Sequence, residues 1–253
     1  MMKEKYNIRV LEKQDISKAV ALVTSSFEKE YLIPSIYRGK GIEKFISNEL
    51  DNKFSPYRYF VLLYENEVAG YLEYKIFQDS TVAFLNIIAV SNAYKQKGTG
   101  KKLLEFSMDF FAERKFNFIQ LDVYKTNTVA LNWYLGFGFE QKNSNSFFKI
   151  EVNKNKPEHN SILVQNYPQF KELNEEFGFS LLDITLGTDS FRLGTIGKDL
   201  ILRNAYSQTL LGDLPNFMEM MHFENLYYLG NICEAKECKL INEILRMELN
   251  IKL

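Results

Sequence analysis

The sequence predicts an α/β protein whose sheet mixes parallel and antiparallel strands, as in α+β folds. Three observations lead to this prediction. An apolar run at 83–90 indicates a buried strand, because it is β-branched and lacks sustained polar alternation. Apolar residues between 103 and 111 then recur at helical spacing, and a further apolar strand follows at 118–124. A strand, a helix and a second strand in this order give two parallel strands joined by a right-handed crossover.

The other segments before residue 152 are short strands and helices at close spacing. Asp15 stands where an N-cap belongs, directly before a helical apolar pattern. The polar turn at 65–67 joins two β-rich runs into a hairpin. In chain order we expect strand 6–11, helix 16–23, helix 41–50, strands 57–64 and 68–77, the elements named above, helix 128–135, and a closing hairpin of 137–141 and 147–152.

A polar segment at 153–160, which contains two lysines and a proline, predicts a linker. It divides the chain into a domain at 1–152 and a smaller α+β domain at 161–253. In the second domain we expect strands at 178–186, 191–195, 199–203 and 226–229, a helix at 214–221, and a strand or helix at 243–251.

Composition limits the function classes. The 253 residues are 46% hydrophobic and 15% aromatic, which is typical of a globular protein with a sizeable core. A net charge of −1 gives no reason to expect nucleic-acid or membrane binding. No apolar run reaches the roughly 20 residues that span a bilayer, and residues 1–6 lack the apolar core of a signal peptide. We therefore expect a cytoplasmic protein with Cys233 and Cys238 as free thiols, and no metal site.

A glycine-containing loop lies between the apolar strand at 83–90 and the helix after it. Glycines let backbone N–H groups approach a phosphate closely, and the start of a helix adds a positive dipole end. The dinucleotide and P-loop patterns both fail, because Leu103 replaces a glycine in the first and Lys102 replaces the hydroxyl residue in the second. A simple glycine-capped turn is the alternative. The loop reads Lys95, Gln96, Lys97, Gly98, Thr99 and Gly100, and is followed by Lys101.

This loop resembles the acetyl-coenzyme A motif of the GNAT superfamily of N-acetyltransferases, Arg/Gln-x-x-Gly-x-Gly/Ala, with Lys95 at the first position. The resemblance continues through Asn127, Ala130, Tyr134 and Gly138-Phe139, and covers about residues 6–152. It implies a GNAT-like fold whose two central parallel strands splay apart at their C-terminal ends. The second domain looks like a degenerate GNAT-like lobe without the glycine loop; an unrelated small α+β cap is the alternative.

The resemblance implies transfer of an acetyl group from acetyl-CoA to a primary amine, directly and in a ternary complex. Tyr134 would protonate the departing thiolate, and Asn127 would bond the cofactor arm. The other cofactor-binding residues it implies are Ile88, Ala89 and Val90 for the pantetheine arm, and Lys95, Gln96, Lys97, Gly98, Thr99, Gly100 and Lys101 around the pyrophosphate.

The general base differs from the family pattern, because Asn86 stands where many relatives carry a glutamate on the central strand. Glu73 on the preceding strand is our candidate substitute, and Asp122 on the following strand is the second. The loss of that glutamate keeps open a non-catalytic acyl-CoA-binding or regulatory module as an alternative function.

The acceptor is expected to be a small-molecule or peptide amine. Tyr31, Tyr37 and Arg38 lie in a region that lines the acceptor cleft in this family, so they are candidate acceptor contacts. The second domain is expected either to close one side of this cleft or to form the face of a homodimer.

Overall fold

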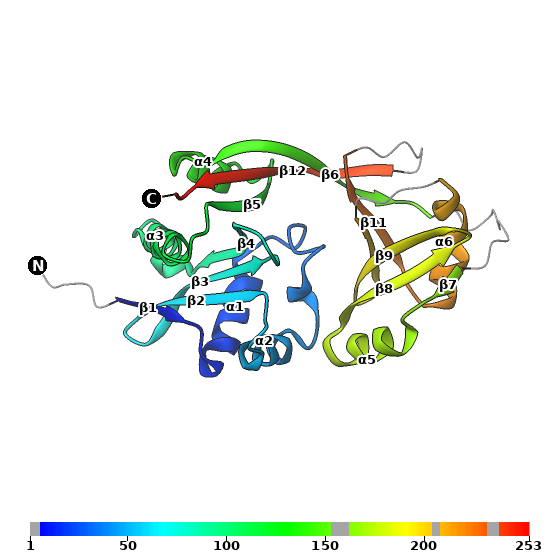
Figure 1. Cartoon of the computed structure of the whole chain (residues 1–253), viewed down its shortest axis with the longest axis horizontal. Helices are drawn as coiled ribbons and strands as arrows, with labels where there is room; N and C mark the ends of the chain where they lie inside the picture. Colours follow the sequence, from blue (N-terminus) through cyan, green and yellow to red (C-terminus); the bar gives the residue numbers. More distant parts are fainter. Residues whose placement is uncertain (1–5, 153–161, 204–207, 232–237, 253) are drawn as a thin grey trace, which may run out of the picture.

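The structure is a computed structural model that describes residues 6–152, 162–203, 208–231 and 238–252. Over these residues the chain forms two lobes joined by one twelve-stranded mixed sheet, with β6 and β12 running from one lobe into the other (Figure 1). The predicted α/β fold class with a mixed sheet is confirmed. The first half contains β1 (Tyr6–Val10), α1 (Ile16–Ser26), α2 (Ile42–Asp51), β2 (Tyr57–Tyr64), β3 (Glu67–Ile76), β4 (Val82–Val90), α3 (Thr99–Ala112), β5 (Phe118–Tyr124), α4 (Thr128–Gly136) and β6 (Glu140–Ile150). The second half contains β7 (Ile162–Val164), α5 (Tyr167–Phe177), β8 (Phe179–Leu186), β9 (Asp189–Ile196), β10 (Asp199–Arg203), α6 (Gln208–Met220), β11 (Asn225–Gly230) and β12 (Cys238–Asn250).

The strands of the sheet follow the order β1-β2-β3-β4-β5-β12-β6-β11-β10-β9-β8-β7. Each strand of the first half has a counterpart six strands later in the chain, so that β1 corresponds to β7 and β6 to β12. With counterparts treated as equal, the order is a palindrome. The pairs β4 with β5 and β10 with β11 are parallel, and each is joined through a helix, α3 or α6. The other neighbouring pairs are antiparallel. The two halves therefore repeat one fold.

The two halves also exchange their last strands. β12 pairs with β5 over Ile244–Asn250, and β6 pairs with β11. β6 and β12 then pair with each other at the centre of the sheet. The predicted linker at 153–160 lies outside the described residues, and the two-domain division stays a prediction. On each side of that segment, the chain contributes a strand to the sheet of the other half.

Some expected elements differ from the structure. The predicted hairpin of 137–141 and 147–152 is wrong, because 140–150 forms the single strand β6. Its polar middle resembles a turn in sequence, but it is held extended by β12. The region 162–177, for which we predicted no element, forms β7 and α5. The segment 243–251, expected as strand or helix, is strand: all but its last residue belongs to β12.

The core of the first lobe lies on both faces of its strands, since alternate residues of a strand point to opposite faces. Buried residues of α1 and α2 pack on one face, and those of α3 pack on the other together with Leu245, Met247 and Leu249 of β12. Gly70 of β3 permits the close approach of α3, because a Cβ there would lie 2.5 Å from Leu103 Cδ1. The second lobe has its own core, which includes α6.

Two further expectations can be compared with the structure. Cys238 is disulfide-bonded, so the expectation of a free thiol is wrong at this residue, because it rested on cellular compartment alone. Cys233 lies outside the described residues. The helices of the described part include none that is both long and apolar enough to cross a bilayer.

Candidate active site

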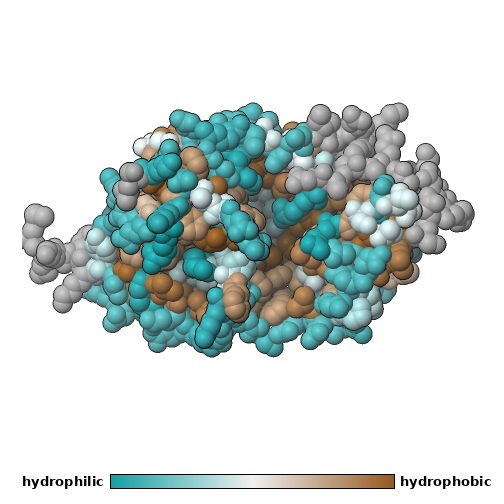
Figure 2. Space-filling model, in the orientation of Figure 1, coloured by the Kyte–Doolittle hydropathy of each residue, from teal (hydrophilic) through white to brown (hydrophobic). Residues whose placement is uncertain are grey.

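A cleft of about 1620 Å³ lies between the two lobes and is lined by residues of both. Figure 2 shows the surface hollowed between the lobes, with apolar residues inside the hollow. The loop after β4 lines the cleft, as do the ends of β4 and β5. Residues of α5 and of strands β8 to β11 line it from the second lobe. The cleft thus joins the predicted cofactor loop to the second half of the chain.

The central parallel strands part inside this cleft. β4 and β5 pair only between Val82–Leu85 and Phe118–Leu121, although β4 continues to Val90. The backbone groups of β4 that face β5 beyond Leu85 are therefore left without partners from that strand, and they are available to a ligand. The predicted splay is confirmed. Ile88, Ala89 and Val90 all line the cleft at this opening.

A β-bulge lies at the start of the opening. Glu73 of β3 faces Ile87, and Tyr74 faces Leu85, so Asn86 is an extra residue on β4. Bulges next to active sites re-aim side chains, and this one turns Asn86 toward Glu73. Asn86 Nδ2 donates a hydrogen bond to Glu73 Oε1 at 2.9 Å.

The loop after β4 presents backbone N–H groups to the cleft. Gln96 and Gly98 have φ values of 60° and 77°, and α3 begins at Thr99. No side chain caps this helix in the described structure, so the N–H groups of its first turn are free for a ligand. Thr99 Oγ1 donates to the carbonyl of Tyr94 at 3.1 Å and holds the turn. An uncapped helix N-terminus beside lysines is suited to an anion.

The predicted loop residues divide into two groups. Lys95, Gln96, Gly98, Thr99, Gly100 and Lys101 line the cleft. Lys97 is not among the lining residues; its ammonium lies 5.6 Å from the centre of the Tyr94 ring. Gly100 allows α3 and α4 to come together, since a Cβ there would lie 3.3 Å from the Trp133 ring.

Tyr134 and Asn127 reach the cleft from α4 and its N-cap. Asn127 Oδ1 accepts a hydrogen bond from the Ala130 N–H at 3.2 Å, which caps the helix. Tyr134 is buried against Trp133 and Phe139. Within the described part of the chain its hydroxyl has no hydrogen-bond partner, and burial raises its pKa. The phenol therefore stays protonated, as a proton donor must.

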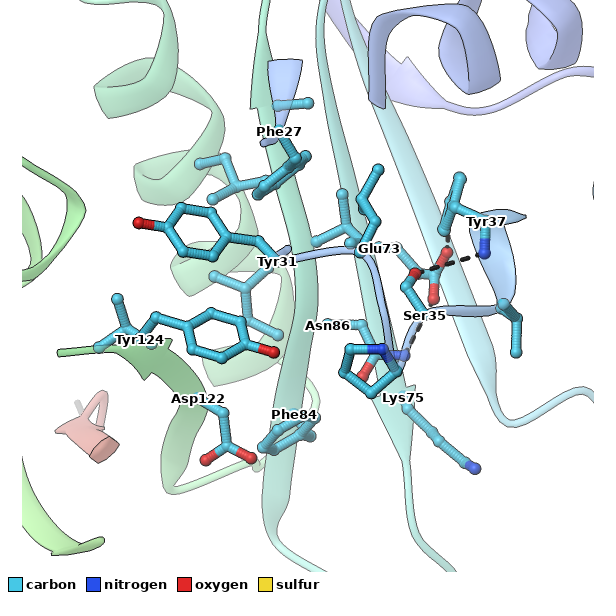
Figure 3. A pocket seen from close by; sticks show the side chains of 18 of the residues that line it. Phe27, Tyr31, Ser35, Tyr37, Glu73, Lys75, Phe84, Asn86, Asp122 and Tyr124 are labelled. Atoms are coloured by element: carbon cyan, nitrogen blue, oxygen red, sulfur yellow. Dashed lines mark hydrogen bonds between the residues drawn. The ribbon is translucent and has the colours of Figure 1, made fainter. Parts of the chain in front are cut away.

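Glu73 forms a buried polar cluster with three neighbours, drawn in part in Figure 3. Its side chain is 2% exposed, and it still lines the cleft. The Tyr37 hydroxyl donates to Glu73 Oε2 at 2.6 Å, and the Tyr71 hydroxyl lies 3.3 Å from the same oxygen. Burial raises the pKa of Glu73, while the hydrogen bonds from Tyr37, Asn86 and Tyr71 oppose the rise. A carboxyl with a raised pKa is a better proton acceptor than an exposed one.

Asp122, the second candidate base, is held by Arg246 through two hydrogen bonds of 2.5 and 2.9 Å. Both carboxylate oxygens of Asp122 are therefore occupied by the Arg246 guanidinium. Both residues line the cleft.

The three predicted acceptor contacts lie in different environments. Tyr31 stacks on Tyr124 with ring centres 4.8 Å apart, and it lines the cleft. Tyr37 lines the cleft as part of the Glu73 cluster. Arg38 is not among the lining residues; it binds Asp199 at 2.5 Å and so links the two lobes.

From the sequence we expected the second domain to close one side of the cleft or to form a dimer face, but we predicted none of the residues on that side. Residues of the second lobe do line the cleft, and they form its second-lobe wall. This wall contains mostly apolar residues and one cation, Arg203, which lies at the end of β10. A polar end on a predicted strand at 199–203 was the only indication in the sequence.

The parallel strands of the second lobe, β10 and β11, do not part as β4 and β5 do. β10 and β11 pair at every residue from Asp199 to Arg203, with Asn225 to Leu229 opposite. The described part of this lobe therefore has no opening like that between β4 and β5. The described residues also contain no group of three or more His, Cys, Asp or Glu side chains placed to hold a metal ion.

Comparisons with known proteins give the same fold. The model of the acetyltransferase (GNAT) family matches residues 23–139. A tandem GNAT protein from the clavulanic acid biosynthesis pathway is similar over 98% of this chain and 99% of its own, at 8% identity and a TM-score of 0.71. A GCN5-related N-acetyltransferase from Sphaerobacter thermophilus matches over 100% and 98%, at 9% identity and 0.67. A putative acetyltransferase from Pyrococcus horikoshii matches over 99% and 91%, at 13% identity and 0.62. Whole-chain similarity to a tandem GNAT protein agrees with the symmetric strand order, in which the second half repeats the fold of the first.

Proposed function

Because residues 23–139 match the model of the GNAT acetyltransferase family, we propose that this protein transfers an acetyl group from acetyl-CoA to a primary amine. The transfer is direct and takes place in a ternary complex. One observation supports the proposal most directly. The opening between β4 and β5, the uncapped N-terminus of α3 and the side chain of Tyr134 all lie in one cleft.

Most of the groups that bind the cofactor are backbone groups. Unpaired backbone groups at Ile88, Ala89 and Val90 bond the pantetheine arm, and the amides from Gln96 to Lys101 surround the pyrophosphate. Lys95, Lys97 and Lys101 supply positive charge around the loop, and Gly98 and Gly100 keep side chains out of the way. Thr99 fixes the turn. Asn127 has its Oδ1 engaged with the backbone of α4, so its Nδ2 is the atom left for the cofactor arm.

The chemistry needs one proton acceptor and one proton donor. The coenzyme supplies an acetyl group activated as a thioester. Glu73 takes a proton from the amine, directly or through one water, as the new C–N bond forms. The C–S bond breaks, and the Tyr134 hydroxyl gives its proton to the sulfur. Asn86 and Tyr37 hold one carboxylate oxygen of Glu73 each and so fix its orientation.

The burial of Glu73 supports a second candidate function. A base that is 2% exposed and already accepts three hydrogen bonds is poorly accessible to an amine. A chain that retains the cofactor loop without a reachable base would be an acyl-CoA-binding or regulatory module. The homodimer expected from the sequence stays a prediction, to be tested by light scattering.

Thiol release from acetyl-CoA over a panel of small amines and peptides tests both functions. We expect release with at least one amine, and a fall in kcat of about 10²-fold or more in Tyr134→Phe with acetyl-CoA affinity retained. Tyr167→Phe, an exposed tyrosine on α5 outside the cleft lining, is the matched control. Tight acetyl-CoA binding without release for any amine would favour the binding module.

A further inference from the structure

The second-lobe wall of the cleft carries a single charge. The lining residues from α5 and strands β8 to β11 are Leu173, Phe177, Phe179, Ser180, Leu181, Gly194, Thr195, Ile196, Ile201, Arg203 and Leu229. Of these only Arg203 is ionisable at neutral pH. An apolar wall with one guanidinium is an unusual surface for a site whose substrate is an amine, because a cation repels a cation.

Arg203 has no carboxylate partner within the described residues. Its one hydrogen bond there runs from Nη2 to the Pro34 carbonyl at 3.3 Å. By contrast Arg38, Arg192 and Arg246 each bind an aspartate. Solvent reaches the Arg203 side chain inside the cleft, but the surrounding protein lowers its pKa by burial. The guanidinium is therefore accessible from the cleft and has no carboxylate partner within the described residues.

A second polar group at the same place also lacks a partner. The Tyr124 hydroxyl is buried and has no hydrogen bond within the described part of the chain. Burial and the nearby Glu30 raise the pKa of Tyr124, and the charge of Arg203 opposes that rise. Tyr124 and Arg203 both line the cleft. Figure 3 shows the hydroxyl of Tyr124 pointing into the cleft. Native proteins leave few buried hydroxyls unsatisfied, so this hydroxyl is available as a donor to a molecule bound in the cleft.

The carboxylate whose charge raises the pKa of Arg203 is already engaged elsewhere. Asp122 lies close enough to affect the pKa of Arg203, but both of its oxygens accept hydrogen bonds from Arg246. Arg203 and Tyr124 together therefore offer donors to an oxygen anion supplied from outside.

We propose, on the basis of the acetyltransferase function above, that the acceptor is an amine that also carries a carboxylate and an apolar body. Arg203 binds the carboxylate, the Tyr124 hydroxyl donates a further hydrogen bond to it, and the apolar second-lobe wall holds the body. A guanidinium matches the geometry of a carboxylate with two parallel hydrogen bonds. One cation on an otherwise apolar wall suits a monoanion better than a phosphate. Arg203 is in this view a specificity-determining residue that the second lobe contributes to the active site of the first.

Matched pairs of amines test the proposal, each pair differing only in the carboxylate. Suitable pairs are phenylalanine with phenethylamine, leucine with isopentylamine, and 4-(aminomethyl)benzoate with benzylamine. We expect at least one acid to exceed its partner tenfold or more in kcat/KM. Arg203→Gln is expected to reduce that ratio to near one by raising the KM of the acid, with the KM of acetyl-CoA unchanged. Arg203→Lys should restore part of the ratio. Arg192→Gln, an arginine outside the cleft lining, is the control and should behave as wild type.

The outcomes separate this proposal from the function on which it rests. Acetylation of amines with no preference for an acid, or with a preference that Arg203→Gln leaves intact, would overturn the proposal and leave the acetyltransferase standing. A rise in the KM of acetyl-CoA in Arg203→Gln, without change for the acid, would assign Arg203 to the cofactor and also overturn it. If no amine reacts, calorimetry with the same acids in the presence of coenzyme A decides. Binding that depends on Arg203 would support the carboxylate site without the enzyme, and no binding would remove both.

Discussion

The exchanged strand β12 gives a sharp prediction about stability. Met247 lies on β12, about one hundred residues along the chain from β5 and β6, between which it is inserted. Its side chain is 0% exposed and packs in the core that also holds α3. We therefore expect Met247→Ala, a substitution in the second half of the sequence, to destabilise the first lobe.

The magnitude follows from burial. Truncation of a buried methionine to alanine costs about 2–5 kcal/mol of unfolding free energy. Leu245, Leu249 and Ile251 are buried in the same core, and each contributes about 1.5–3 kcal/mol. Deletion of 243–253 removes all four side chains and the central strand. The summed loss of about 6.5–14 kcal/mol is as large as the whole stability of a typical domain, about 5–15 kcal/mol, so the truncated chain should not fold.

Urea unfolding followed by tryptophan fluorescence measures the effect. The single tryptophan, Trp133, lies on α4 and reports on the first lobe. Lys239→Ala, an exposed side chain on the same strand, is the control and should change stability by no more than about 0.5 kcal/mol. The reasoning fails if Met247→Ala unfolds like wild type, or if the chain without 243–253 still unfolds cooperatively and binds acetyl-CoA with normal affinity.

Three further predictions concern the site. The raised pKa of Glu73 should make the acetylation rate climb with pH through that pKa, and Glu73→Gln should lower kcat by about 10²–10⁴-fold and abolish that pH dependence. Folding favours the protonated carboxyl, so the stability that Glu73 contributes is present below its unfolded pKa and is lost as pH rises through its folded pKa; urea midpoints should depend less on pH in Glu73→Gln. Gly98→Val should cost about 1–3 kcal/mol of stability and weaken acetyl-CoA binding, because Gly98 has a positive φ. The control Gly136→Ala places its Cβ where no atom lies within 4 Å, so it should leave the affinity for acetyl-CoA unchanged. Equal effects of the two substitutions would contradict this prediction. Titration calorimetry should find one acetyl-CoA per chain, since β10 and β11 do not part, and a stoichiometry of two would refute that argument.

The sequence predicted what short-range pattern controls. The hairpin of β2 and β3 and the strand–loop–helix around Gly98 depend on residues close together in the chain, and their bounds agree with the structure within a few positions. β6 could not be predicted in this way. Its polar residues resemble a turn, and only pairing with β11 and β12, both distant in sequence, keeps it extended.

In the candidate site, too, residues within one local segment could be predicted, whereas contacts between distant segments could not. The loop and Tyr134 were found from spacing within one segment. The contact between Asn86 and Glu73 depends on a bulge, which shifts the register of β4 against β3 and has no sequence pattern of its own. Arg203 comes from the other lobe, so its place in the cleft depends on how the two halves meet. Nothing near it in the chain indicates an anion.

The exchanged strands also affect how the protein is made. Every other strand of the second half leaves the ribosome before β12, yet the cofactor lobe lacks a central strand until β12 is synthesised. The first lobe therefore cannot finish folding before the second half has been synthesised, whereas an N-terminal domain ordinarily folds first. Its unpaired β5 edge must wait, exposed, for a partner encoded far downstream, and a nascent chain of this design is one for which chaperone contact would matter most.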